Sequence, residues 1–139
     1  MKNSGKLIVG LTFVATCFLF SQTSNAQAKP KGKVWKVPAA SEKMKSPVKF
    51  DAAAVSAGKT LWGTNCKSCH GVKGLGDGNK AAKIDISCGD FSSNDIQSIT
   101  DGGLYYKTTE GRRPMPSFKE KLSNTDRWQL VAFMRTLKK

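Results

Sequence analysis

Cys66-Lys67-Ser68-Cys69-His70 stands at the end of a segment with helical periodicity. Asp51 is a good N-cap for that segment, because its carboxylate can accept a hydrogen bond from a free N–H of the first turn. The predicted helix begins after Asp51, and its inward-facing residues recur at helical spacing: Val55, Gly58, Leu61, Trp62 and Asn65. Four glycines within residues 71–78 then predict a loop.

This Cys-x-x-Cys-His spacing is typical of covalent haem attachment. Two thiols one helical turn apart can reach the two vinyl groups on one edge of a porphyrin, and the histidine that follows can reach the iron from one face. The predicted cofactor is one haem c per chain, bound by Cys66 and Cys69, with His70 as an iron ligand.

Three other interpretations of the two thiols remain open. A thioredoxin-like redox pair would follow a strand and open a helix, whereas this motif closes a helix. A zinc site would need four ligands. Cys66, Cys69, Cys88 and His70 could be counted to four, but the sequence has no second pair of ligands at the short spacing that zinc sites use. A disulfide between Cys66 and Cys69 would leave His70 unexplained.

The second axial ligand cannot be a histidine of this chain, because His70 is its only one. Met115 is the predicted distal ligand. It lies between Pro114 and Pro116, which restrict the backbone and lower the entropy cost of holding the loop against a metal. Thioether sulfur is a soft ligand, and a His/Met pair raises the haem potential. The alternatives are a methionine that only fills core space, a lysine ligand, or an open iron.

The chain is predicted to have three parts. Residues 1–28 have the features of a secretory signal peptide: a positive start, an apolar run over residues 7–20 and a cleavage site after Ala28. The run is too short for a typical membrane anchor, which is the alternative. Cys17 lies inside it, and lipidation there is a minor alternative. Residues 29–49 form a basic extended arm with seven lysines and three prolines, on which Trp35 is a candidate contact with the domain. Residues 50–139 form the domain itself.

The rest of the domain is predicted to be helical with long loops. One helix is expected over residues 94–101, capped by Ser92 and Asp95 and stopped by Gly102-Gly103. A long loop is expected over residues 104–122, and a last helix begins near Ser123. No segment alternates with period two. The predicted fold class is therefore all-α, with three to four helices wrapped around one haem.

These residues resemble the class I c-type cytochromes over residues 47–137, through the haem motif, Pro114-Met115-Pro116 and the closing helix. The resemblance implies that the first and last helices cross in contact, at four residues: Gly58, Trp62, Leu130 and Phe133. Many relatives carry a proline after Gly-Asp-Gly, near the carbonyl that accepts the second N–H of the proximal imidazole. Asn79 stands there in this chain, so a carbonyl within residues 79–81 is the expected acceptor.

The predicted function is one-electron transport by a soluble periplasmic carrier, not catalysis, because two axial ligands leave no open site on the iron. The net charge of +13 favours redox partners with acidic docking surfaces, and export without a nucleic-acid motif disfavours nucleic acid. A monomer is expected. Cys88 is expected to be a small buried residue, and the alternatives are a disulfide with a partner or a dimer contact. The alternatives are an electron-transfer subunit of a larger respiratory or dehydrogenase complex, with the arm as a docking element, and a gas-binding protein with an open iron.

Overall fold

The computed structural model describes residues 29–139, so the expected signal peptide and Cys17 lie outside the described residues. The described elements are α1 (Ala39–Glu42), α2 (Ala52–Asn65), α3 (Lys67–His70), the 3₁₀ helix η1 (Ala81–Lys83), α4 (Asn94–Gln97), α5 (Asp101–Glu110) and α6 (Asn124–Arg135). Within residues 29–139 the only extended pairing is one bridge between Arg112 and Met115. The all-α prediction is confirmed.

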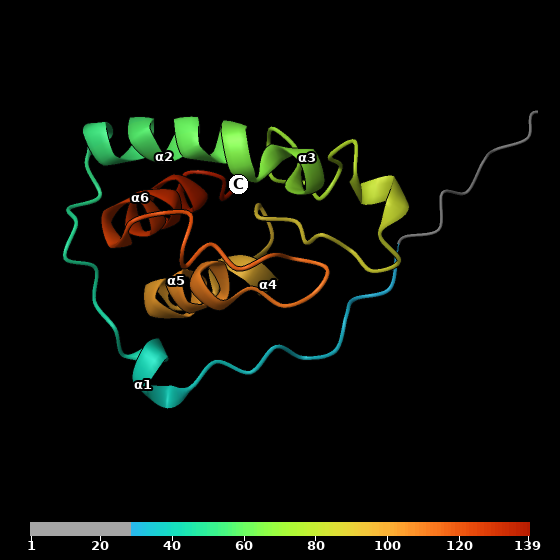
Figure 1. Cartoon of the computed structure of the whole chain (residues 1–139), viewed down its shortest axis with the longest axis horizontal. Coiled ribbons are helices and arrows are strands. Elements are labelled where there is room, and N and C mark those ends of the chain that lie inside the picture. Colours follow the sequence, from blue (N-terminus) through green and yellow to red (C-terminus); the bar gives the residue numbers. More distant parts are fainter. Residues whose placement is uncertain (1–28) are drawn as a thin grey trace, which may run out of the picture.

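The packing of α2 against α6 is the centre of the fold (Figure 1). The two helices approach so closely at Gly58 that a Cβ there would lie 2.0 Å from the carbonyl oxygen of Gln129. Trp62 and Leu130 are buried beside this contact, and the rings of Trp62 and Phe133 lie 5.7 Å apart. The helix crossing implied by the family resemblance is therefore confirmed, with glycine allowing the backbones to meet.

The two expected N-caps of these helices are also confirmed. The Asp51 carboxylate accepts a hydrogen bond from the N–H of Ala54 at 3.0 Å. Ser123 and Asp126 form a reciprocal capping box at the start of α6. Both signals are local in sequence, which is why they could be recognised before the fold was known.

The helix expected over residues 94–101 is wrong. The chain forms α4, breaks, and starts α5, whose N-cap is Thr100. Gly102 lies in the first turn of α5 instead of ending a helix, and α5 then occupies much of the expected loop. The physical reason is tertiary: a Cβ on Gly102 would lie 2.0 Å from the Ser41 carbonyl oxygen, so this glycine lets α1 pack against α5.

The capping box expected from Ser92 is wrong as well. The Ser92 N–H and hydroxyl both donate to the carboxylate of Asp90, at 2.8 and 2.7 Å. The N-cap of α4 is Ser93, whose side chain makes no capping hydrogen bond. A preceding aspartate therefore takes the serine that would have capped the helix.

Residues 29–49 pass below α5 to α1 in Figure 1 and then rise past α6 to the start of α2. They are extended for most of their length, and α1 adds one helical turn that the sequence pattern did not predict. Across residues 29–139 no helix has both the length and the apolar character needed to cross a bilayer.

Candidate functional site

One thiol of the motif lies just before a one-turn helix, and the other lies within it. Cys66 is the C-cap of α2, and α3 follows at once, so Cys69 sits one turn beyond Cys66. Cys66 is buried and Cys69 half-buried, and neither is in a disulfide with another described residue. Burial first, and then the nearby Cys69, raise the pKa of Cys66 to about 12. The Cys66 side chain is therefore a protonated thiol at neutral pH.

The His70 imidazole is held in one orientation. Its ring packs against both Trp62 and Phe91, with centroids 5.6 and 5.2 Å away. Nδ1 donates a hydrogen bond to the Cys88 carbonyl at 2.6 Å. Burial lowers the pKa of His70, which favours the neutral ring. With the proton on Nδ1, the lone pair is on Nε2, as a metal ligand requires.

The expected acceptor within residues 79–81 is therefore wrong, and the Cys88 carbonyl takes its place. The N–H of Lys80 donates to the Ser68 carbonyl at 2.7 Å, which ties that segment to the backbone of α3 instead. The chain then continues through η1 before it returns to His70. A backbone carbonyl carries no residue signature, so nothing in the sequence could have singled out Cys88 for this contact.

Trp62 joins the helix crossing to the motif. Its ring is buried, and its indole N–H donates to the Gly71 carbonyl at 2.9 Å. The same ring lies edge-on to Phe91, with centroids 5.0 Å apart. One side chain on α2 thus sets the position of the imidazole and of the backbone that follows it.

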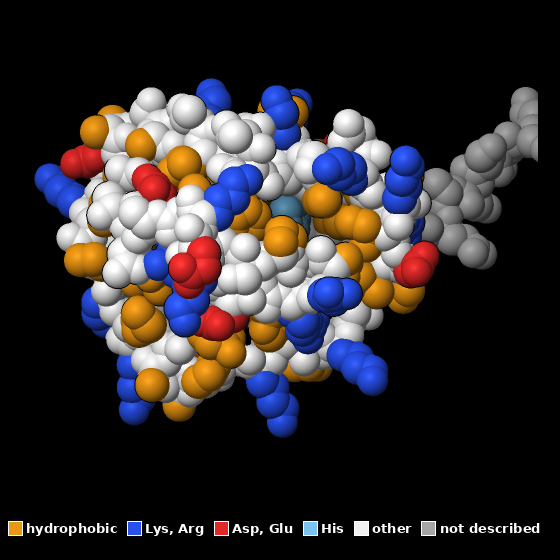
Figure 2. Space-filling model, in the orientation of Figure 1, with side chains coloured by type: hydrophobic (Ala, Val, Ile, Leu, Met, Phe, Trp, Pro, Cys, Tyr) orange, Lys and Arg blue, Asp and Glu red, His pale blue; other side chains and the backbone are white. Residues whose placement is uncertain are grey.

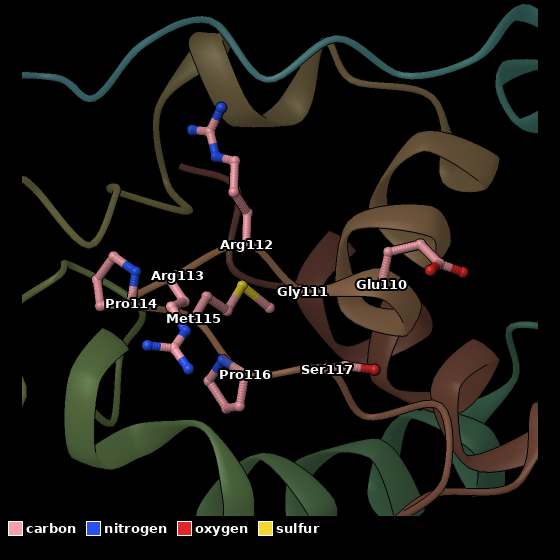
Figure 3. A pocket seen from close by; sticks show the side chains of 8 residues that line it. All are labelled: Glu110, Gly111, Arg112, Arg113, Pro114, Met115, Pro116 and Ser117. Carbon is pink, nitrogen blue, oxygen red and sulfur yellow. The ribbon is translucent and has the colours of Figure 1, made fainter.

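Met115 lies in a tight turn after α5. Its N–H donates to the Arg112 carbonyl at 2.8 Å, and the Arg112 N–H donates back to the Met115 carbonyl at 2.9 Å. The Arg113–Pro114 peptide bond between them is cis. Residues 110–117 line a cavity of about 460 Å³, and Figure 3 shows the Met115 thioether inside this loop. Met115 is half-buried and packs against the hydrophobic core cluster that also contains Cys66.

The other methionines of the described residues are placed differently. Met134 is buried in α6 as expected, and Met44 on the arm is 41% exposed. Among the described methionines, only Met115 both lies outside a helix and packs against the core cluster.

The donors and the walls of the site both suit a haem. In Figure 2 the histidine side chain lies in a hollow bordered by hydrophobic side chains, with Lys and Arg around it. Two thiols one turn apart, an imidazole presenting Nε2 and apolar walls are the groups that a covalently bound haem needs. In residues 29–139 no group of three or more His, Cys, Asp or Glu side chains is arranged to hold a metal ion by itself. The residues present fit haem.

Comparisons with known proteins agree with this geometry. The family model described as Cytochrome c matches residues 55–138. The chain is 34% identical to the quinohemoprotein alcohol dehydrogenase of Comamonas testosteroni over 88 residues. These residues make up 63% of this chain and 12% of that protein. The chain therefore spans only a small part of that relative's length.

Two solved structures are similar to this chain. One is the Kuenenia stuttgartiensis reducing HAO-like protein complex Kustc0457/Kustc0458, with a TM-score of 0.62 and 30% identity over 68% of this chain and 48% of that one. The other is the KustC0563 c-type cytochrome, with a TM-score of 0.51 and 31% identity over 59% of this chain and 98% of that one. Since the family model covers more than half of the sequence, this chain belongs to the cytochrome c family, an electron-transfer family whose members bind haem c covalently.

Proposed function

We propose that this chain is an exported, soluble, periplasmic one-electron carrier with one haem c. Thioether bonds from Cys66 and Cys69 hold the haem, and His70 and Met115 are its axial ligands. When bound, the haem supplies an iron that alternates between the ferrous and ferric states. The observation that carries the proposal is the hydrogen bond from His70 Nδ1 to the Cys88 carbonyl.

That hydrogen bond does what a proximal ligand needs. It fixes the tautomer and the ring plane, and it raises the basicity of Nε2. The contacts of Trp62 and Phe91 with the ring restrict its rotation. An imidazole held in one position moves little when the charge on the metal changes, which favours rapid electron transfer.

Met115 is the proposed distal ligand because its turn is short and is closed by two backbone hydrogen bonds between Arg112 and Met115. A thioether is neutral and soft, and it stabilises ferrous iron relative to ferric iron. With two protein ligands in place, the chain leaves no position for a substrate, so we propose a carrier and not an enzyme.

Partner encounter is proposed to depend on charge. Lys and Arg side chains surround the hollow that contains the histidine (Figure 2), and the whole chain carries a formal charge of +13. Such a surface attracts acidic partners, and the attraction falls as salt screens it. We expect electron exchange with an acidic partner to slow with ionic strength. A rate that is independent of salt would remove the steering proposal.

The test of the haem site uses protein exported from cells that can attach haem. Denatured protein should have the mass of the polypeptide plus one haem, and its ferric spectrum should contain the weak sulfur-to-iron band. Met115→Ala should abolish that band, whereas Met44→Ala on the exposed arm should leave it unchanged. A mass equal to that of the bare polypeptide would refute haem attachment. A band that persists in Met115→Ala would refute the distal ligand.

A second candidate function is an electron-transfer subunit held within a larger enzyme. The similarity to 12% of a quinohemoprotein alcohol dehydrogenase, and to a chain of the HAO-like protein complex, favours it. Purification from the native cell at high salt separates the two: a carrier elutes alone, and a subunit remains with its partners. An open iron, the third alternative, would bind carbon monoxide readily in the reduced protein at neutral pH.

A further inference from the structure

Residues 29–37, called the strap here, contact the chain on both sides of the proposed haem site. At its start, the Lys29 ammonium donates to the carbonyls of Ala81 at 2.6 Å and Ala82 at 3.0 Å, in η1. The Pro30 carbonyl accepts a hydrogen bond from the N–H of Ser87 at 3.0 Å. Ser87 directly precedes Cys88, whose carbonyl orients His70. The strap is thus bonded to the segment that supports the proximal ligand.

The other end of the strap is bonded to the Met115 turn. The Arg112 guanidinium donates to the carbonyls of Lys33 at 2.9 Å and Val34 at 3.2 Å. The same guanidinium lies over the Trp35 ring, 4.7 Å from its centroid. Arg112 is also the residue whose backbone exchanges two hydrogen bonds with Met115. If Arg112 moves, Met115 should therefore move with it, because two backbone hydrogen bonds join the two residues.

The two sides of the Met115 turn are anchored differently. After Met115, the Ser117 hydroxyl donates to the Thr109 carbonyl at 2.6 Å, and Phe118 is buried. That side is held by α5 and the core. Before Met115, the side chain of Arg112 reaches the strap. On that side the backbone of α5 ends with the hydrogen bond from the Gly111 N–H to the Lys107 carbonyl at 3.0 Å, and the strap adds a side-chain restraint beyond it.

We propose that Trp35 and Arg112 are positioning residues for the distal ligand, and that the strap couples the Met115 turn to the segment that orients His70. This inference rests on the proposed function, because it takes His70 and Met115 as the axial pair. The strap then acts as a clamp on the Met115 turn. While the strap is bound to Arg112, the thioether stays within reach of the iron. When these contacts are lost, the turn moves away from the iron more often.

Trp35→Ala and Arg112→Lys test the clamp in the haem-loaded protein. The first removes the aromatic ring, and the second keeps the charge but loses the planar fork that serves two carbonyls. Both variants should keep covalent haem and a helical far-ultraviolet spectrum. Both should weaken the ferric sulfur-to-iron band and speed carbon monoxide binding to the ferrous protein about tenfold, since opening of the turn limits access to the iron.

Two controls separate positioning from general stability. Trp35→Phe keeps a ring beneath the guanidinium and should restore slow carbon monoxide binding. Val34→Ala changes a neighbouring strap side chain that is 85% exposed, and both readouts should remain as in the unmodified protein. A residue with only a structural role would lower the unfolding midpoint without changing the carbon monoxide rate under native conditions.

The outcomes distinguish this inference from the proposed function. If Met115→Ala abolishes the band while Trp35→Ala and Arg112→Lys bind carbon monoxide at the unmodified rate, the clamp is refuted and the ligand proposal stands. If the unmodified protein lacks the band, the ligand proposal fails, and the clamp fails with it. If Trp35→Ala does not accumulate, Arg112→Lys decides by the same two readouts.

Discussion

Gly58→Ala is the sharpest test of how α2 and α6 pack. A Cβ at position 58 would lie 2.0 Å from the Gln129 carbonyl oxygen and 2.9 Å from Phe133 Cβ. Ordinary contacts begin at 3.4 Å. The nearest atoms belong to the backbone of α6 and cannot rotate away. The helices must therefore move apart, which loosens the packing of Leu130 and Trp62.

The expected magnitude is the difference between two effects. Alanine gains about 1 kcal/mol over glycine in a helix interior. Overpacking a close contact costs about 1–3 kcal/mol, and sometimes more. Because backbone atoms obstruct the new methyl group, the upper part of that range applies, at about 3 kcal/mol. Gly58→Ala should therefore lower the free energy of unfolding by about 2 kcal/mol.

Gly63→Ala is the matched control. Gly63 is in the same helix, and a Cβ there would have nothing within 4 Å. This variant should be more stable than the unmodified protein by up to about 1 kcal/mol. The assay is guanidinium unfolding of both ferric haem-loaded variants, followed by far-ultraviolet circular dichroism. Equal stability of the two variants would refute the packing argument, because helix propensity alone would then explain both.

Three further outcomes are expected. Ser123→Ala removes the N-cap of α6 and should cost about 1 kcal/mol in denaturant unfolding; an unchanged midpoint would show that the cap is replaced by water. Trp62→Phe leaves the Gly71 carbonyl without its 2.9 Å donor and should cost about 1–3 kcal/mol, with no loss if that carbonyl finds another partner. Burial, and then Arg112, lower the pKa of Lys107, so the folded protein binds less proton than the unfolded chain between that pKa and the ordinary value of about 10.4. Stability should therefore rise with pH through that window, and Lys107→Met should remove the rise; an equal rise in the variant would assign it elsewhere.

The haem-binding motif and the two helix caps could be predicted from the sequence without the fold. The thiol–thiol–imidazole spacing of residues 66–70 requires one helical turn, and the structure has it in α3. Asp51 and Ser123 cap the helices that follow them, because capping joins residues three positions apart. Export, the iron ligands and the partner class stay predictions, to be decided by the experiments above.

Other features depended on contacts between distant segments. Gly102 resembled a helix stop, yet it lies inside α5 because α1 packs onto it. The acceptor for His70 is a carbonyl of Cys88, eighteen residues along the chain, and any residue type could have provided it.

The amino-acid sequence by itself determined which thiols, imidazole and thioether are available, and that the thiols and the imidazole come at the end of a helix capped by Asp51. Only the tertiary structure decided how those groups are held, through the Gly58 contact, the Cys88 carbonyl and the strap contacts of Arg112. Side-chain type and local spacing are written in the sequence, whereas backbone hydrogen bonds and close approaches arise only when remote segments meet.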